Sequence, residues 1–104
     1  MSFLPSMMKD YHIEKINDIT QTAQTWSRNP KYKYYFVHAR VGGSDEYKFF
    51  DPDLTPPNAN LQITMYYDGS NNAFVAISVR EDRLVFSITG SGYSVSTMSL
   101  YGVY

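Results

Sequence analysis

Three consecutive stretches of the chain alternate apolar and polar side chains, and this pattern constrains the fold more than any other feature. Strict alternation is typical of strands that bury one face, and a slip of one residue would turn each apolar set toward water. We therefore predict an antiparallel meander of three strands. The stretches are Leu61–Tyr67, Ala73–Val79 and Leu84–Thr89.

Two short connections predict the register of this meander. Glu81 and Asp82 suit a two-residue turn, and Asp68–Asn72 suit a five-residue loop. The predicted partners are Val79 and Leu84, Ile77 and Phe86, Val75 and Ile88, Tyr67 and Ala73, Met65 and Val75, and Ile63 and Ile77. The predicted buried face comprises Leu61, Ile63, Met65, Val75, Ile77, Val79, Leu84, Phe86 and Ile88.

Residues 10–28 are predicted to form one amphipathic helix. Their apolar side chains recur at spacings of three and four, which places them on one face of a helix. Asp10 is suited to cap the N-terminus of this helix. Pro30 disfavours helical geometry at Asn29, so the helix should end near Arg28. The apolar stripe is Ile13, Ile16, Ile19, Ala23 and Trp26.

Lys31–Val41 is predicted to form a strand, because it is rich in aromatic and branched residues. Val37, Ala39 and Val41 suit the core, which leaves the alternate side chains facing outward or lying under a loop. A turn at residues 42–45 should lead into a short strand, Glu46–Phe50.

The remaining segments are predicted to be a long loop, a turn and a last strand. Three prolines in Asp51–Asn60 argue against helix and central strand there. Gly90-Ser91-Gly92 is predicted to turn the chain into a final strand, Tyr93–Tyr101. Neither face of that strand is strongly apolar, so we expect it at the edge of the sheet.

These elements predict an α+β fold in a single domain, residues 1–104. One N-terminal amphipathic helix would pack on an antiparallel β-sheet of about five to six strands, because a helix and a sheet each hide one apolar side. One helix cannot cover six strands, so the other sheet face should be solvated, closed by curling or covered by a partner. Cysteine is absent, which excludes disulfides and thiolate metal sites.

The composition is that of an ordinary globular protein with many tyrosines. The chain has ten tyrosines and a net charge of −1. Residues 1–41 carry six basic and three acidic side chains, whereas residues 42–104 carry three basic and seven acidic ones. Nonspecific nucleic-acid binding needs a stronger basic field, and signal peptides and membrane spans need longer apolar runs. We therefore expect a cytoplasmic protein with no membrane contact and no nonspecific binding of nucleic acid.

No group of residues predicts catalysis, a cofactor or a metal. His12 and His38 have no companion at the spacing of metal ligands. Gly90-Ser91-Gly92 lacks the lysine of a phosphate-binding loop. We therefore expect a protein that is not an enzyme. Four acidic residues around the long loop lack the spacing of a calcium loop and should be solvated; they are Asp45, Glu46, Asp51 and Asp53.

The segment from Arg28 to Arg40 interleaves basic and aromatic side chains, which are typical anchors of protein interfaces. Two alternatives are a second, smaller core around Phe36 and the stacking of single-stranded bases. The acidic loop is a second candidate for the contact. The residues predicted to bind a protein partner are Tyr32, Tyr34, Phe36, His38, Arg40, Asp51 and Asp53.

The predicted helix and meander, carried by Ile19–Trp26 and Ala73–Thr89, resemble the soluble heads of pilin-like proteins, without the long apolar stalk of that family. Small cysteine-free, tyrosine-rich single domains also resemble phage-borne and plasmid-borne inhibitors of host systems. We predict a small non-enzymatic macromolecule-binding protein, an inhibitor or immunity factor acting through a protein–protein interface. The alternative is a structural subunit of a virion, pilus or other homo-oligomeric assembly, paired through its uncovered sheet face and last strand.

Overall fold

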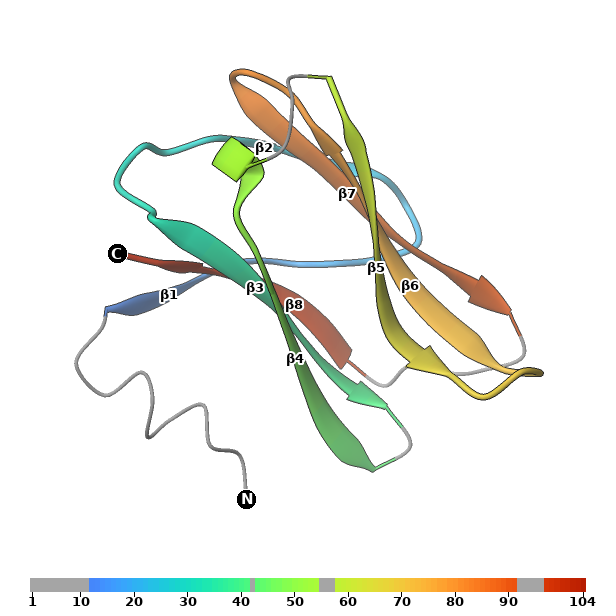
Figure 1. The fold of residues 1–104 in the computed structure, drawn as a ribbon. Helices are drawn as coiled ribbons and strands as arrows, with labels where there is room; N and C mark the ends of the chain where they lie inside the picture. Colours follow the sequence, from blue (N-terminus) through green and yellow to red (C-terminus); the bar gives the residue numbers. More distant parts are fainter. Residues whose placement is uncertain (1–11, 42, 55–57, 92–96) are drawn as a thin grey trace.

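The chain folds into two four-stranded antiparallel β-sheets that pack face to face (Figure 1). A computed structural model describes residues 12–41, 43–54, 58–91 and 97–104. A short 3-10 turn, η1 (Pro52–Leu54), lies between the fourth and fifth strands. The strands are β1 (Ile13–Asp18), β2 (Gln24–Ser27), β3 (Tyr34–Val41), β4 (Ser44–Phe50), β5 (Asn60–Tyr67), β6 (Asn72–Val79), β7 (Arg83–Ser91) and β8 (Thr97–Val103).

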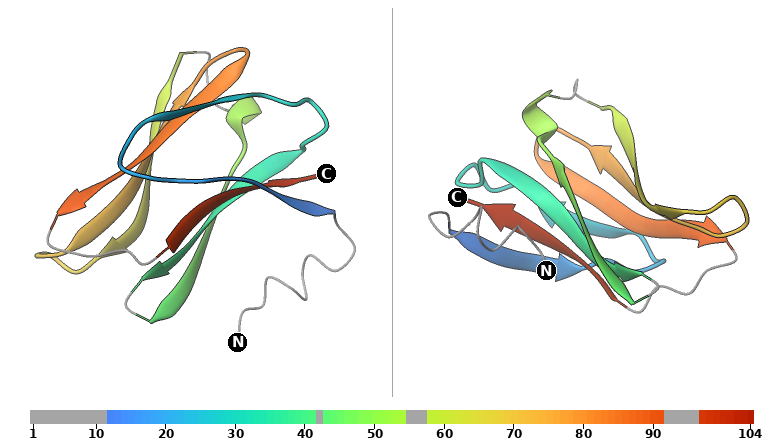
Figure 2. Two further views of the ribbon diagram at one scale, coloured as in Figure 1. Left: turned by 180° about the vertical axis from the view of Figure 1, so that it is seen from behind. Right: turned by 60° about the horizontal axis from the view of Figure 1, so that its bottom comes forward.

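The first sheet has the strand order β1-β8-β3-β4, and the second has the order β2-β7-β6-β5. The first two strands pair with the last two, β1 with β8 and β2 with β7, and the chain between β1 and β2 crosses from the first sheet to the second (Figure 2). Backbone hydrogen bonds continue through the crossing, from Ile19 N–H to the Met98 carbonyl (3.0 Å) and from Ile88 N–H to the Thr20 carbonyl (2.8 Å). Residues 19 and 20, between β1 and β2, are therefore hydrogen-bonded to both sheets.

The core lies between the inner faces of the two sheets. The predicted buried face of the meander is confirmed, with Leu61, Ile63 and Ile88 partly buried at its margin. Val37, Ala39 and Val41 are buried as predicted. The first sheet contributes Tyr35, Val37, Ala39, Val41, Met98 and Leu100, and the second contributes Met65, Val75, Ile77, Val79, Leu84 and Phe86.

The predicted register is confirmed for β6 and β7 and is wrong for β5. All three predicted β6–β7 pairs occur, closed by the turn at Glu81 and Asp82. In β5, Ile63 lies opposite Val75 instead of Ile77. The loop before β6 is one residue shorter than predicted, and an irregularity at Met65 takes up one more residue. For residues 60–64 the shift is two residues, which leaves each side chain on its predicted face. Beyond Met65 the shift is one residue, so Tyr66 rather than Tyr67 lies opposite Ala73 and packs against the core.

The predicted α+β fold is wrong, because residues 13–18 and 24–27 form the strands β1 and β2 rather than a helix. Isoleucine, threonine and tryptophan favour strands. The spacing of three residues between these isoleucines has a cause other than a helix. A β-bulge at Ile16 adds one residue between Ile13 and the rest of β1. Ile19 follows the end of β1, where the chain leaves the first sheet. The predicted helix cap, Asp10, lies outside the described residues.

The strands predicted to extend one large sheet instead form a second layer. β3, β4 and β8 belong with β1 to the first sheet, and this sheet covers the meander in place of the predicted helix. β8 lies between β1 and β3 and is not an edge strand; Leu100 is buried on its inner face and Val103 on its outer face. Gly90 and Ser91 belong to β7 rather than to a turn, and residues 92–96 lie outside the described ranges.

The long loop begins with η1, although its prolines argued against helix. The Asp51 side chain accepts a hydrogen bond from Asp53 N–H (2.9 Å), and the Asp51 carbonyl accepts one from Leu54 N–H (3.1 Å). Pro52 follows directly, at the position where a helical turn needs no N–H donor. This turn places Asp53 at one end of the sandwich.

Candidate interaction surface

Four of the predicted partner-binding residues lie together on the outer face of the first sheet, on alternate positions of β3. They are Tyr34, Phe36, His38 and Arg40. The register places aromatic residues of the neighbouring strands beside them, with Phe36 opposite both Phe49 of β4 and Tyr101 of β8. We call the six rings of this surface the aromatic face; they belong to Tyr34, Phe36, His38, Tyr47, Phe49 and Tyr101.

Phe36 is the centre of the aromatic face and is 3% exposed. Its ring stacks on Tyr101 with centroids 4.9 Å apart and planes 4° apart, and the Phe49 centroid lies 5.2 Å away. His38 stacks on Tyr47 at 4.7 Å. The alternative prediction that Phe36 packs in a second, smaller core is therefore confirmed. That core comprises Phe36 and Val103 with the half-buried Tyr34, Tyr47 and Tyr101.

The aromatic face is nevertheless partly open to solvent. Phe49 is 40% exposed, and Ile13, at the β1 edge of the same sheet, is 40% exposed. Within the described ranges, both sheets pack inward on each other and no element lies over this outer face (Figure 2). Partly exposed aromatic rings around a well-packed centre are typical of protein–protein interfaces.

Charged side chains border the aromatic face on two sides. The Asp45 carboxylate lies 3.0 Å from His38 Nε2 and 3.2 Å from Arg40 Nη1. The hydrogen bond with His38, and then the charge of Arg40, hold the pKa of Asp45 below its usual value. On β1, Lys15 and Asp18 form an ion pair at 2.7 Å, which lowers the pKa of Asp18 and raises that of Lys15.

Three rings of the aromatic face were not among the predicted contact residues. Tyr47 and Phe49 alternate within the predicted strand Glu46–Phe50, and that alternation was the signal that would have found them. The position of Tyr101 depends on β8 lying beside β3, and no local pattern in the sequence indicates that pairing.

Tyr32, predicted to bind a partner, lies in the core instead. Its side chain is 9% exposed, and its ring centroid lies 5.7–5.8 Å from those of Trp26, Tyr35 and Tyr104. Its hydroxyl donates a hydrogen bond to the Glu14 carboxylate. Burial is the main cause that raises the pKa of Tyr32. Tyr32 therefore connects β1, β2 and the C-terminal end of β8, and its role in this arrangement is structural.

Replacing Tyr32 by phenylalanine is expected to destabilise the protein more at pH 7 than at pH 3. Hydrogen bonds from Tyr32 and then from Lys31 hold the pKa of Glu14 below its usual value of 4.5, so folding favours the ionised carboxylate. This contribution to stability is present above pH 4.5 and is lost as the pH falls through the lower pKa of the folded state.

Urea unfolding of the wild type and of Tyr32→Phe at both pH values measures this difference. Tyr67→Phe is the matched control, because Tyr67 is 65% exposed and, among the described residues, its hydroxyl makes no hydrogen bond to a carboxylate. An equal loss of stability at pH 7 and pH 3 in Tyr32→Phe would contradict the assigned role of Glu14.

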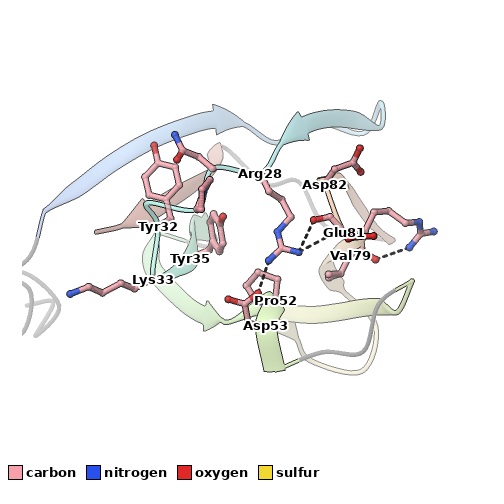
Figure 3. Close-up of a pocket in the computed structure, with 12 residues that line it drawn as sticks. Arg28, Tyr32, Lys33, Tyr35, Pro52, Asp53, Val79, Glu81 and Asp82 are labelled. Atoms are coloured by element: carbon pink, nitrogen blue, oxygen red, sulfur yellow. Dashed lines mark hydrogen bonds and ion pairs between the residues drawn. The ribbon is translucent and has the colours of Figure 1, made fainter.

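Asp53 lies at one end of the sandwich, beside a pocket of about 540 Å³ (Figure 3). Arg28 donates hydrogen bonds to the carbonyl oxygens of Arg80 (3.0 Å) and Glu81 (3.4 Å), and its other terminal nitrogen lies 2.8 Å from Asp53 Oδ1. This guanidinium joins the end of β2, the β6–β7 turn and η1. Asp51 caps η1, so both predicted acidic contact residues hold the loop in place.

The pocket does not assemble a recognisable catalytic group. Its carboxylates, Asp53, Glu81 and Asp82, are exposed, and no histidine is among its lining residues. The four carboxylates predicted near the long loop do not gather, because Asp45 and Asp51 are separated by the length of β4, about 20 Å at 3.3 Å per residue. In the part of the chain that the structure describes, no three histidine or acidic side chains could hold a metal ion.

The aromatic face is thus the candidate site with the clearest binding chemistry. In the residues that the structure covers, no helix is long and apolar enough to span a membrane. No family model, curated protein or solved structure matches this chain.

Proposed function

We propose that this protein is a small non-enzymatic binding protein that contacts a protein partner through its aromatic face, as an inhibitor or immunity factor of phage or plasmid type does. The observation that carries this proposal is the open aromatic surface of the first sheet, where Phe49 is 40% exposed beside the nearly buried Phe36. Rigid aromatic rings bury much area on binding at little cost in conformational entropy.

The border of the aromatic face supports a protein partner over a nucleic acid. Lys15 and Asp18 lie on one side and Arg40 and Asp45 on the other, so each cation has an acidic partner. A phosphate backbone requires an excess of positive charge, which this face lacks. The surface fits an apolar protrusion of a protein, flanked by side chains of both charges.

Phe49→Ala is expected to weaken partner binding about 30-fold, which corresponds to about 2 kcal/mol and is the scale of an interface hot spot. The partner is identified first, by photo-crosslinking from a benzophenone amino acid at position 49 in cells that produce the protein. Calorimetry with the purified partner then gives the affinity. Circular dichroism confirms that the variant is folded.

Leu54→Ala is the matched control for this experiment. Leu54 is 84% exposed and lies in η1, away from the aromatic face, so its removal should leave the affinity unchanged. Equal affinity of Phe49→Ala and the wild type would refute the assignment of the contact surface. So would crosslinking from position 54 in the absence of crosslinking from position 49.

A structural subunit of a virion, pilus or other assembly is the second candidate function. The predicted pairing through the last strand is excluded, because β8 has neighbours on both sides. The observation that favours an assembly is a different one: β5 is an edge strand without charged residues.

A further inference from the structure

The two sheets have four edge strands, and three of them are protected against pairing with another chain. β1 carries Glu14 and Lys15 and is interrupted by the bulge at Ile16. β4 carries three charged residues, Asp45, Glu46 and Lys48. β2 is only four residues long. Charges, bulges and short length are the usual means by which proteins prevent edge pairing.

β5 has no charge along its length. Its eight residues, Asn60–Tyr67, include no charged residue, proline or glycine. Its one irregularity is at Met65, so residues 60–64 form a regular strand. In the described structure β6 is the one strand that pairs with β5, and β4 approaches it without forming a ladder (Figure 1). β5 is therefore the edge at which this fold can accept a further strand.

The ladder between β5 and β6 determines which backbone groups of β5 point to the open side. Val79 N–H donates to the Ala59 carbonyl at 2.8 Å. In an antiparallel pair, every second residue of a strand makes such bonds. Ala59 is bonded to β6, so Leu61 and Ile63, two and four residues further on, are bonded to β6 as well. The N–H and C=O groups of the intervening Gln62 and Thr64 therefore point away from β6, where a new strand would bind them.

We propose that β5 pairs antiparallel with β5 of a second copy of this chain, about a twofold axis at Gln62. Gln62 then lies opposite Gln62 of the partner subunit, and Asn60 lies opposite Thr64 of the partner subunit. About six backbone hydrogen bonds join the two strands in this register. The second sheet of one subunit and the second sheet of the other then form one continuous sheet of eight strands.

A second copy suits this edge because the strand is complementary to itself in that register. On the inner face, Leu61 lies opposite Ile63 of the partner subunit, so two side chains that are only partly buried gain apolar neighbours. On the outer face, polar side chains oppose polar ones, and no like charges meet. The contact is isologous, which is the symmetry of most protein dimers. It uses a surface separate from the aromatic face and does not depend on the proposed function.

Sedimentation velocity over a hundredfold range of protein concentration tests this proposal. The wild type is expected to shift from monomer to dimer. Gln62→Lys places two ammonium groups opposite each other at the axis, and should raise the dissociation constant of the dimer at least about tenfold. Gln62 is exposed and its backbone is not bonded to β6, so the variant should fold normally.

Thr25→Lys is the matched control, because it adds the same charge at an exposed position of β2, the opposite edge of the same sheet. It should dimerise like the wild type. Gln62→Pro removes the outward N–H and should also abolish the dimer, without an added charge. A wild type that stays monomeric at all concentrations overturns the proposal, as does a dimer that survives both Gln62 substitutions or is disrupted equally by Thr25→Lys.

Discussion

Phe86→Ala is expected to lower the free energy of unfolding by about 3–5 kcal/mol. Phe86 is 1% exposed, and its ring belongs to the core that both sheets share. Removing the ring forfeits its apolar burial and leaves a cavity that two hydrogen-bonded sheets cannot close by relaxation. Because small domains are stable by about 5–15 kcal/mol in total, this one change removes a large part of the stability.

Urea unfolding followed by the fluorescence of Trp26, the single tryptophan, measures this loss. Phe74→Ala is the matched control. Phe74 is in the adjacent strand β6, but on the outer face and only partly buried, so its truncation should cost less than half as much. A loss below about 1 kcal/mol in Phe86→Ala would contradict the sandwich core described above.

Gly90→Ala is expected to cost about 3 kcal/mol or more, for two reasons that add. The φ angle of Gly90 is +152°, a backbone conformation that residues with a side chain rarely adopt. A Cβ at this position would also lie within 3.0 Å of the backbone carbonyl oxygen of Asn72 in β6. That oxygen is part of the main chain, so it cannot move aside as the end of a flexible side chain would.

Gly69→Ala separates these two reasons. Gly69 also has a positive φ, +91°, but a Cβ there meets nothing within 4 Å. Its replacement should therefore cost only the backbone strain, about 1–2 kcal/mol. Thermal unfolding of both variants compares them, and equal losses would show that Gly90 is required for its φ angle alone.

The sequence allows a strand pairing to be predicted where the two strands follow each other directly in the chain. The β6–β7 hairpin needs only its alternation and the two-residue turn at Glu81 and Asp82, and its register is as predicted. The β5–β6 register depends also on a bulge, which leaves no mark in the pattern of apolar residues. The error there was at most two residues, and the buried face was still identified.

The elements that could not be predicted are those whose partners lie far away in the chain. A spacing of three residues is common to a helix and to a strand with a bulge, so Ile13 and Ile16 alone cannot distinguish them. The segment forms a strand because β1 pairs with β8, at the other end of the chain. The same limit applies to the aromatic face: alternation along β3 placed Phe36 on an outer face, but Tyr101 reaches it through β8.

The pairing of the first two strands with the last two also has a consequence for how the chain folds in time. During synthesis the hairpin of β3 and β4 and the meander of β5, β6 and β7 can form as they emerge, whereas β1 finds its partner only after residues 97–103 have been made. Closing so long a loop is slow, and sandwiches dominated by distant pairings fold in milliseconds to seconds. Until β8 inserts, β3 offers an open strand edge to other newly made chains, so the interval before that insertion is when this protein is most exposed to misassembly.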